Sequence, residues 1–365
     1  MNTLDSFSET YQRAREKFVG VASRAAGELE QLWHPEVGPD GSKLSTDVAW
    51  LGPRDAEHVL VLISGTHGVE GFAGSGAQVD WLARGEAARM PPDVAALLIH
   101  AINPYGFAWL RRVTHENVDL NRNWIDFNEP LPQNAAYDTL ADAICPTDWS
   151  EESQSRSNAL LAQYGAQHGK AALQRVFQGG QYSHPNGIFY GGSSPTWSRQ
   201  TQTGIFSEYL QRASRVAIID FHTGLGPWGF GERIALSPPA NAAFDRATRW
   251  YGKEVTRPGD GTSASAPIVG DGLTASFKLL PRAEVTAMAL EFGTLPVESV
   301  LQALRADAWL HTHGKLDSPQ GRAIKSQLRA AFYGDAGDWK GMIAGQALLA
   351  CRQAVAGLTE IRSAP

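Results

Sequence analysis

Two segments of the chain carry residues whose types and spacing are typical of a metal site. The first is Gly65-Thr66-His67-Gly68-Val69-Glu70, which directly follows the apolar run of residues 58–64. That run predicts a buried strand, and ligands of open α/β sheets bind beyond the carboxyl ends of the strands. An isolated H-x-x-E pattern arises often by chance, but this placement predicts that His67 and Glu70 converge on one ion.

The second segment supplies another imidazole at the same edge of the sheet. His222 follows the apolar run of residues 215–221, which also predicts a buried strand. Two histidines and one carboxylate, with one position left open, form a common shell for a catalytic zinc ion. We therefore predict one Zn²⁺ per chain, held by His67, Glu70 and His222. Asp220 shares a strand face with His222 and could be an outer hydrogen-bond acceptor.

A further carboxylate, Glu291, lies near the end of the apolar run of residues 285–292. Burying a carboxylate there is costly unless the site needs it. Beside a metal ion, such a group can take a proton from an attacking water and pass it to a leaving amine. Glu291 is therefore the predicted general base and acid of a hydrolytic reaction. The alternative is a strand-end glutamate that pairs with a surface cation.

A cluster of cationic and amide side chains lies between these segments. Arg111, Arg112 and Arg122 fall within a dozen residues of one another, together with Asn121. A guanidinium group suits bidentate capture of a carboxylate. It can also stabilise the negative charge that develops on a carbonyl oxygen during reaction. Taken alone, an arginine cluster is more often a surface ion-pair network.

The elements that must position these residues alternate along the chain. Strands are predicted at residues 58–64, 94–102, 215–221 and 285–292, and helices at residues 8–32, 71–84, 296–312 and 339–357. This alternation predicts an α/β fold with a largely parallel sheet covered on both faces. Residues 128–205 are predicted to be an insertion near the active site, with a helix near 151–177. Residues 253–275 are rich in Gly, Ser and Pro and predict a loop.

Composition narrows the class of protein. The chain has 365 residues, 43% of them hydrophobic, and a net charge of −6, which fits a single domain over residues 1–365. No long basic block points to nucleic acid or an anionic membrane, and no run reaches the length of a membrane span. The N-terminus lacks the pattern of a secretory signal. Cys145 and Cys351 suggest no disulfide framework, so we expect a cytoplasmic protein.

Taken together, these motifs resemble the M14 family of zinc carboxypeptidases. The ordered set is H-x-x-E, N-P-x-G, R-x(5)-V-D-L-N-R-N, D-x-H and E-x-G-T, found here at His67/Glu70, Asn103–Gly106, Arg112–Asn123, Asp220/His222 and Glu291–Thr294. Within that family the chain is most similar to the bacterial DUF2817 branch, partly through residues 181–197. The turn around His67 also resembles the aspartoacylase and succinylglutamate desuccinylase relatives, which hydrolyse N-acyl amino acids.

The resemblance implies both a fold and a set of roles. The fold would be a mixed, twisted eight-stranded sheet with helices on both faces. The zinc ligands and the general base would be the residues named above. Asn121 and Arg122 would bind the free carboxylate of the substrate. Arg112 would polarise the scissile carbonyl, since its offset from the V-D-L-N-R core fits better than that of Arg111.

One family feature has no counterpart at its usual place in this sequence. Digestive-type carboxypeptidases carry a mobile tyrosine upstream of the catalytic glutamate, where this chain has Ile268-Val269-Gly270-Asp271-Gly272. Tyr182 or Tyr190 of the insertion could substitute for it in space. We predict Tyr190 as the substrate-binding residue. No residue can be aligned with the usual determinant of side-chain preference, so that preference stays open.

Three functions fit these residues. The first is a metallocarboxypeptidase that removes C-terminal residues from peptides. The second is an N-acyl-amino-acid amidohydrolase, which needs the same metal, arginines and base. The third is a non-catalytic protein that binds carboxylated ligands, and Glu291 argues against it because a binder needs no base. The depth of the pocket separates the first two, since an open groove favours peptides and a closed one favours a small N-acyl amino acid.

Overall fold

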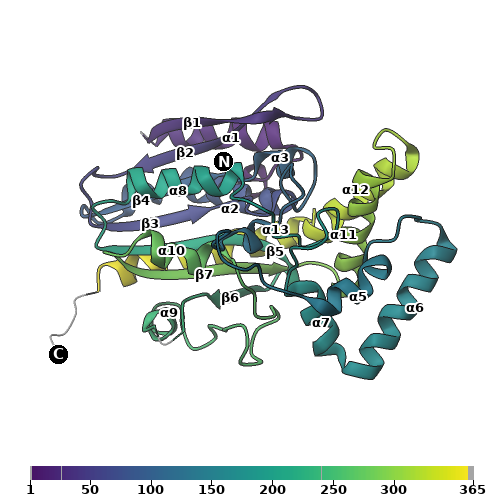
Figure 1. Cartoon of the computed structure of the whole chain (residues 1–365). Coiled ribbons are helices and arrows are strands. Elements are labelled where there is room, and N and C mark those ends of the chain that lie inside the picture. Colours follow the sequence, from purple (N-terminus) through teal and green to yellow (C-terminus); the bar gives the residue numbers. More distant parts are fainter. Residues whose placement is uncertain (1, 26, 240, 361–365) are drawn as a thin grey trace.

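The side chains of the central strands are buried alternately on two faces. Leu60 and Leu62 belong to one apolar cluster, whereas Val59 and Val61 of the same strand belong to another. A strand that is buried on both faces needs a helical layer on each side. The structure, a computed structural model, describes residues 2–25, 27–239 and 241–360. Helices cover both faces of its sheet (Figure 1).

The sheet is mixed, with a parallel centre and antiparallel edges. Within the described residues it has seven strands in the order β1-β2-β4-β3-β5-β7-β6. β3, β4, β5 and β7 are parallel neighbours, and β1, β2 and β6 join by antiparallel pairing. The strands are β1 Glu28–Val37, β2 Lys43–Leu51, β3 His58–Ile63, β4 Val94–His100, β5 Arg215–Trp228, β6 Gly231–Ala235 and β7 Glu284–Gly293. The predicted fold class is confirmed, with seven strands in place of eight.

The predicted helix over residues 8–32 is wrong in its second half. Helix α1 ends at Arg24, residue 26 lies outside the described residues, and strand β1 begins at Glu28. β1 is an edge strand with most of its residues exposed, so its polar composition hides the strand pattern. Its pairing with β2 shifts register between Trp33 and Val37. Strand β2 was also not predicted, because buried polar residues interrupt the run of apolar residues that would have indicated a buried strand.

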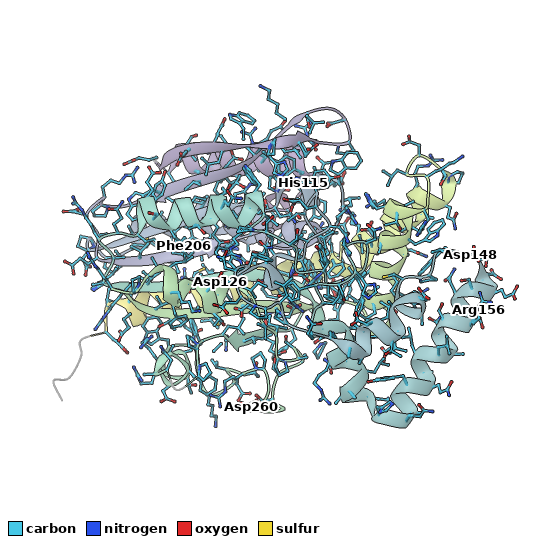
Figure 2. All side chains as sticks on the ribbon, in the orientation of Figure 1. His115, Asp126, Asp148, Arg156, Phe206 and Asp260 are labelled. Atoms are coloured by element: carbon cyan, nitrogen blue, oxygen red, sulfur yellow. The ribbon has the colours of Figure 1, made fainter. Side chains whose placement is uncertain are left out.

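Two helical layers enclose the sheet. The cluster on one face includes side chains of α1 Tyr11–Arg24, α2 Gly71–Ala83, α9 Ala243–Tyr251 and α13 Gly337–Leu358. The cluster on the other face includes side chains of α8 Trp197–Tyr209 and α10 Gly272–Leu279. Phe206 of α8 is buried there (Figure 2). The short elements are η1 Thr3–Ser6, η2 Gly68–Glu70, η3 Ala87–Arg89, α3 Pro104–Ala108 and α4 Leu120–Asn123.

A third group of helices lies beyond one end of the sheet (Figure 1). It shares its own apolar cluster and consists of α5 Ala135–Ile144, α6 Glu151–His168, α7 Lys170–Gln178, α11 Val297–Thr312 and α12 Pro319–Phe332. The single helix predicted near 151–177 is two helices, because Gly169 between them adopts a φ of +90°. Asp148 and Arg156 mark the side of this group that faces away from the sheet (Figure 2).

The predicted single domain over residues 1–365 stays a prediction, and its two ends lie outside the described residues. Helix α12 was not predicted at all. Among the described residues, no helix combines the length and the apolar character that crossing a membrane requires.

Candidate metal centre

The turn after β3 places His67 and Glu70 at the carboxyl edge of the sheet. Gly65 turns the chain with a φ of +71°, a conformation that favours glycine. Gly68 packs against the backbone of α3, where a Cβ atom would lie 2.0 Å from the carbonyl carbon of Gly106. A side chain at position 68 would therefore displace the turn. This geometry favours glycine at both positions.

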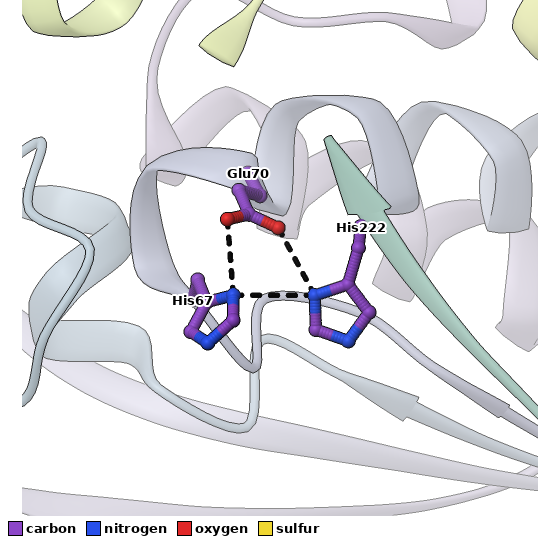
Figure 3. A group of neighbouring side chains, drawn as sticks. All are labelled: His67, Glu70 and His222. Atoms are coloured by element: carbon purple, nitrogen blue, oxygen red, sulfur yellow. Dashed lines mark hydrogen bonds and ion pairs between the residues drawn. The ribbon is translucent and has the colours of Figure 1, made fainter. Parts of the chain in front are cut away.

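Side chains from two distant segments meet at this edge (Figure 3). One ligand atom from each of His67, Glu70 and His222 lies within 4.8 Å of the others, and all three residues are buried. The Nδ1 atoms of the two histidines are 3.2 Å apart. Glu70 spans them, with Oε1 3.0 Å from Nδ1 of His67 and Oε2 3.1 Å from Nδ1 of His222. The three predicted ligands are therefore brought together.

Each imidazole is held from behind by a buried carboxylate. Nε2 of His67 lies 3.1 Å from Oδ1 of Asp119, and Nε2 of His222 lies 2.8 Å from Oδ2 of Asp220. Thr66 in turn donates its hydroxyl to Asp220. A histidine that donates Nε2–H to a carboxylate presents the lone pair of Nδ1 on its other side. Both lone pairs then point at the same small space.

This arrangement suits a cation. Two imidazole lone pairs and the carboxylate of Glu70 repel at about 3 Å unless a proton or a positive ion lies between them. Burial disfavours the charged forms, but the neighbouring charges dominate: the pKa of His222 is raised well above its usual value by Asp220 and Glu70, and His67 and His222 lower that of Glu70. The donor set of two nitrogens and one carboxylate fits zinc.

Glu291 enters the site from the neighbouring strand. It is paired in register with His222 across β5 and β7, and such pairs point to the same face of a sheet. Its Oε1 accepts a hydrogen bond from the backbone N–H of Leu225. Burial, followed by the charge of Glu70, raises the pKa of Glu291 to about 8. A bound cation would oppose this shift.

The structure distinguishes the two adjacent arginines. Arg112 donates to Oε1 of Glu70 at 2.9 Å and to Oδ2 of Asp119 at 3.1 Å, and lines the cavity beside the histidines. Arg111 turns away and pairs with buried Asp307 at 3.1 Å. Only Arg112 of the two is therefore in reach of the centre, and its role in polarising the carbonyl stays a prediction.

Asn121 and Arg122 line the same cavity. Arg122 is 3% exposed and donates to the backbone carbonyls of Asn121 and Gln178, yet its buried Nε has no hydrogen-bond partner. Burial lowers the pKa of Arg122, with the Asp119 carboxylate acting against the shift. Gly180 allows this packing, since a Cβ there would lie 2.6 Å from Cδ of Arg122. A guanidinium group that lines a cavity is suited to bind an anion there.

The cavity that joins these residues is small, about 90 Å³. One apolar part of its wall comes from Ile234, Leu236, Ile268 and Ala289, and another from Leu225, Val297, Val300, Leu301, Leu304 and Phe332. Phe189 also lines it, and its ring lies 5.3 Å from the guanidinium carbon of Arg112 and 5.6 Å from that of Arg122.

Tyr190 is buried but is not among the residues that line this cavity. Its backbone carbonyl accepts the N–H of Asp119. The structure thus places its neighbour Phe189 beside the arginines, and the substrate-binding role of Tyr190 stays a prediction. Tyr182 donates its hydroxyl to the carbonyl of Arg122 and so supports the backbone there.

Sequence reasoning missed Asp119 and Phe189. Asp119 lies inside the V-D-L-N-R-N motif, so a partner for His67 could have been sought there. Phe189 adopts a φ of +56°, a conformation rare for an aromatic residue and sometimes found where function requires it. Nothing in the local sequence signals that conformation.

The fold and site together define a mixed α/β protein with a candidate metal centre at the carboxyl edge of its parallel strands. The family model described as "Protein of unknown function (DUF2817)" matches residues 7–346, so the chain belongs to this family, as predicted. No curated protein matches the sequence.

Several solved structures are similar to the chain. Carboxypeptidase A from Helicoverpa armigera is 13% identical with a TM-score of 0.44, covering 90% of this chain and 75% of that one. A metallo-carboxypeptidase from Burkholderia cenocepacia is 10% identical with a TM-score of 0.44, covering 94% and 68%. Bovine thrombin-activatable fibrinolysis inhibitor is 11% identical with a TM-score of 0.43, covering 94% and 98%.

Proposed function

We propose that the protein is a zinc-dependent hydrolase that cleaves an amide bond next to a free carboxylate, acting as a metallocarboxypeptidase on the C-terminal residue of peptides. The observation that carries this proposal is the convergence of His67, Glu70 and His222 beside Glu291. A buried carboxylate backs each histidine. The combination offers a metal shell, a base and two guanidinium groups around one cavity.

The residues divide the chemistry between them. His67, Glu70 and His222 would hold one zinc ion, which when bound acidifies a water molecule and polarises a carbonyl group. Glu291 takes the proton of the attacking water as the new C–O bond forms. It then delivers a proton to the amine nitrogen as the C–N bond breaks. The burial of Glu291 favours holding that proton between the two steps.

The two arginines would act on different parts of the substrate. Arg122 and Asn121, which line the cavity, would bind the carboxylate of the residue that leaves. Arg112 faces the carbonyl being attacked, where a guanidinium stabilises developing negative charge. Its present bonds to Glu70 and Asp119 keep it beside the metal ligands. Binding and catalysis are therefore assigned to separate groups.

A second candidate is an N-acyl-amino-acid amidohydrolase. The small volume of the cavity and its two apolar walls favour this candidate, because they suit a compact or apolar acyl amino acid. Both candidates need the same metal ligands, base and carboxylate-binding pair.

The test compares two variants with free and amidated substrates, after a zinc-loaded screen of dipeptides and N-acyl amino acids. Arg122→Ala should mainly raise KM, because carboxylate binding is already made in the ground state. Arg112→Ala should mainly lower kcat, because its partner gains charge only during reaction. Amidating the substrate's carboxylate should raise the KM of the wild-type enzyme as Arg122→Ala does. In the Arg122→Ala variant, the same amidation should raise KM little further. Equal cleavage of amidated and free substrates would refute the proposal.

A further inference from the structure

A wide groove lies beside the small metal cavity. It has a volume of about 1000 Å³ and lies between helices α6 and α7 on one side and residues 225–228 and 294–298 on the other. Gln178, Leu225, Val297 and Leu301 line both the groove and the metal cavity. The two spaces are therefore adjacent, and these four side chains form the boundary between them. A ligand whose reacting bond lies at the metal centre would reach the groove by passing these side chains.

The groove lacks the residues that are proposed to bind the substrate's carboxylate. Arg112, Asn121 and Arg122 line the metal cavity but none of them lines the groove. The charged lining residues are Lys170 and Glu298, one of each sign. The substrate's carboxylate therefore stays with Arg122, and the group on the acyl side of the scissile amide points along the groove.

The wall of the groove is apolar and partly open to solvent. Trp228 is 42% and Val297 36% exposed, and Leu173, Phe177 and Leu301 add to the same surface. Apolar groups exposed together in a concave surface mark a binding site for an apolar ligand.

The groove offers few polar partners to a peptide backbone. Gln174 donates to Gln178 and to the carbonyl of Ala264, and Thr294 donates to the carbonyl of Ala331. Pro227 and Pro296 have no backbone N–H. The remaining wall on the α6 and α7 side is helical, and interior helical N–H groups are already bonded. The first turn of α11, at Val297 and Glu298, leaves N–H groups available on the opposite wall. A bound peptide would thus find partners for few of its amides in this groove, whereas an acyl chain needs none.

We propose that the groove is a subsite for an unbranched apolar acyl chain attached to the nitrogen of an amino acid. This inference rests on the proposed hydrolysis of an amide next to a carboxylate, and within that class it favours the second candidate, an N-acyl-amino-acid amidohydrolase, over the carboxypeptidase. Helices α6 and α7, which belong to the predicted insertion, form one wall. The chain length of the acyl group is then a determinant of specificity.

The experiment measures binding and cleavage of N-acetyl-, N-hexanoyl- and N-decanoyl-leucine by the zinc-loaded protein. Leucine suits the wall formed by Ile234, Leu236 and Ile268 and stays constant through the series. Affinity is measured by calorimetry with the Glu291→Gln variant, which should bind without turnover. Each added methylene that enters the groove should tighten binding by about fourfold.

Two variants test whether the dependence of affinity on acyl-chain length arises in the groove. Ala166→Glu puts a charge into the lining from an exposed position of α6, so the fold should be retained. In Ala166→Glu, N-decanoyl-leucine should bind only slightly more tightly than N-acetyl-leucine. Leu160→Glu, on the same helix and 48% exposed but outside the lining, is the matched control and should keep the chain-length dependence.

The outcomes separate this inference from the proposed function. Equal affinity across the series, or tighter binding of a tripeptide ending in leucine than of decanoyl-leucine, would overturn the acyl-chain subsite. Chain-length-dependent binding without any hydrolysis by the wild-type protein would support the subsite and refute the hydrolase. An unchanged chain-length dependence in Ala166→Glu would also overturn the assignment.

Discussion

The metal centre and the apolar groove beside it are built in different ways. The centre is assembled from strand ends and a glycine-bounded turn, and its ligands are buried, with each histidine backed by a carboxylate. The groove is assembled from helices and loop segments, with large apolar side chains left partly exposed. The contrast indicates that the centre is preorganised for chemistry, whereas the groove obtains its selectivity from the apolar area that a ligand covers.

The largest effect is expected from removing a ligand of the centre. His67→Ala should lose the bound zinc and all activity while keeping the fold, because two remaining protein ligands hold the ion poorly. Elemental analysis and circular dichroism of the purified variant measure both properties. A full zinc complement in His67→Ala would contradict the assigned centre.

The next largest effect is expected from replacing Glu291, and it distinguishes the general base from the metal ligands. Glu291→Gln should lower kcat by about 10²–10⁴ while zinc content and substrate affinity stay near wild type, since the amide cannot accept the proton of water. Steady-state kinetics with metal analysis check this. Turnover near that of the wild type would move the base elsewhere.

A smaller effect is expected from the carboxylate behind His67. Asp119→Asn keeps the size of the side chain but weakens its bonds to His67 and Arg112. Zinc affinity should fall by about 10–100-fold, measured by competition with a chelator. Asp307→Asn, which changes a buried carboxylate paired with Arg111, is the matched control. If both variants lose the same affinity, the effect of Asp119 is a general loss of stability.

The smallest effect is expected from a change at the junction of α6 and α7, the two helices that form one wall of the groove. Gly169→Ala forces a residue with a Cβ to a φ of +90°, and no atom lies within 4 Å of that Cβ. The cost is therefore one of backbone strain, roughly 1–2 kcal/mol, visible as a small fall in Tm. Zinc affinity should stay unchanged, because the junction of α6 and α7 is not part of the centre. A drop in zinc affinity would show that the two regions are coupled.

The same contrast explains what the sequence could predict. The ligand segments follow the apolar runs that form β3, β5 and β7, so the placement of His67, His222 and Glu291 at one edge followed from strand periodicity. The edge strand β1 was missed because its exposed residues follow no apolar pattern. The break at Gly169 and the place of Phe189 depend on positive φ angles and on tertiary packing, which local composition does not encode. The groove joins four separate segments and could not be predicted.

Strand β1 has a consequence for how copies of this protein meet. An edge strand offers unpaired backbone groups to any other strand, and long flat edges lead to aggregation. β1 carries Glu28, Glu30 and Glu36 along its exposed length, and its register shift adjoins Pro35, which lacks an N–H. The outer strand thus discourages the sheet from growing into a neighbouring molecule.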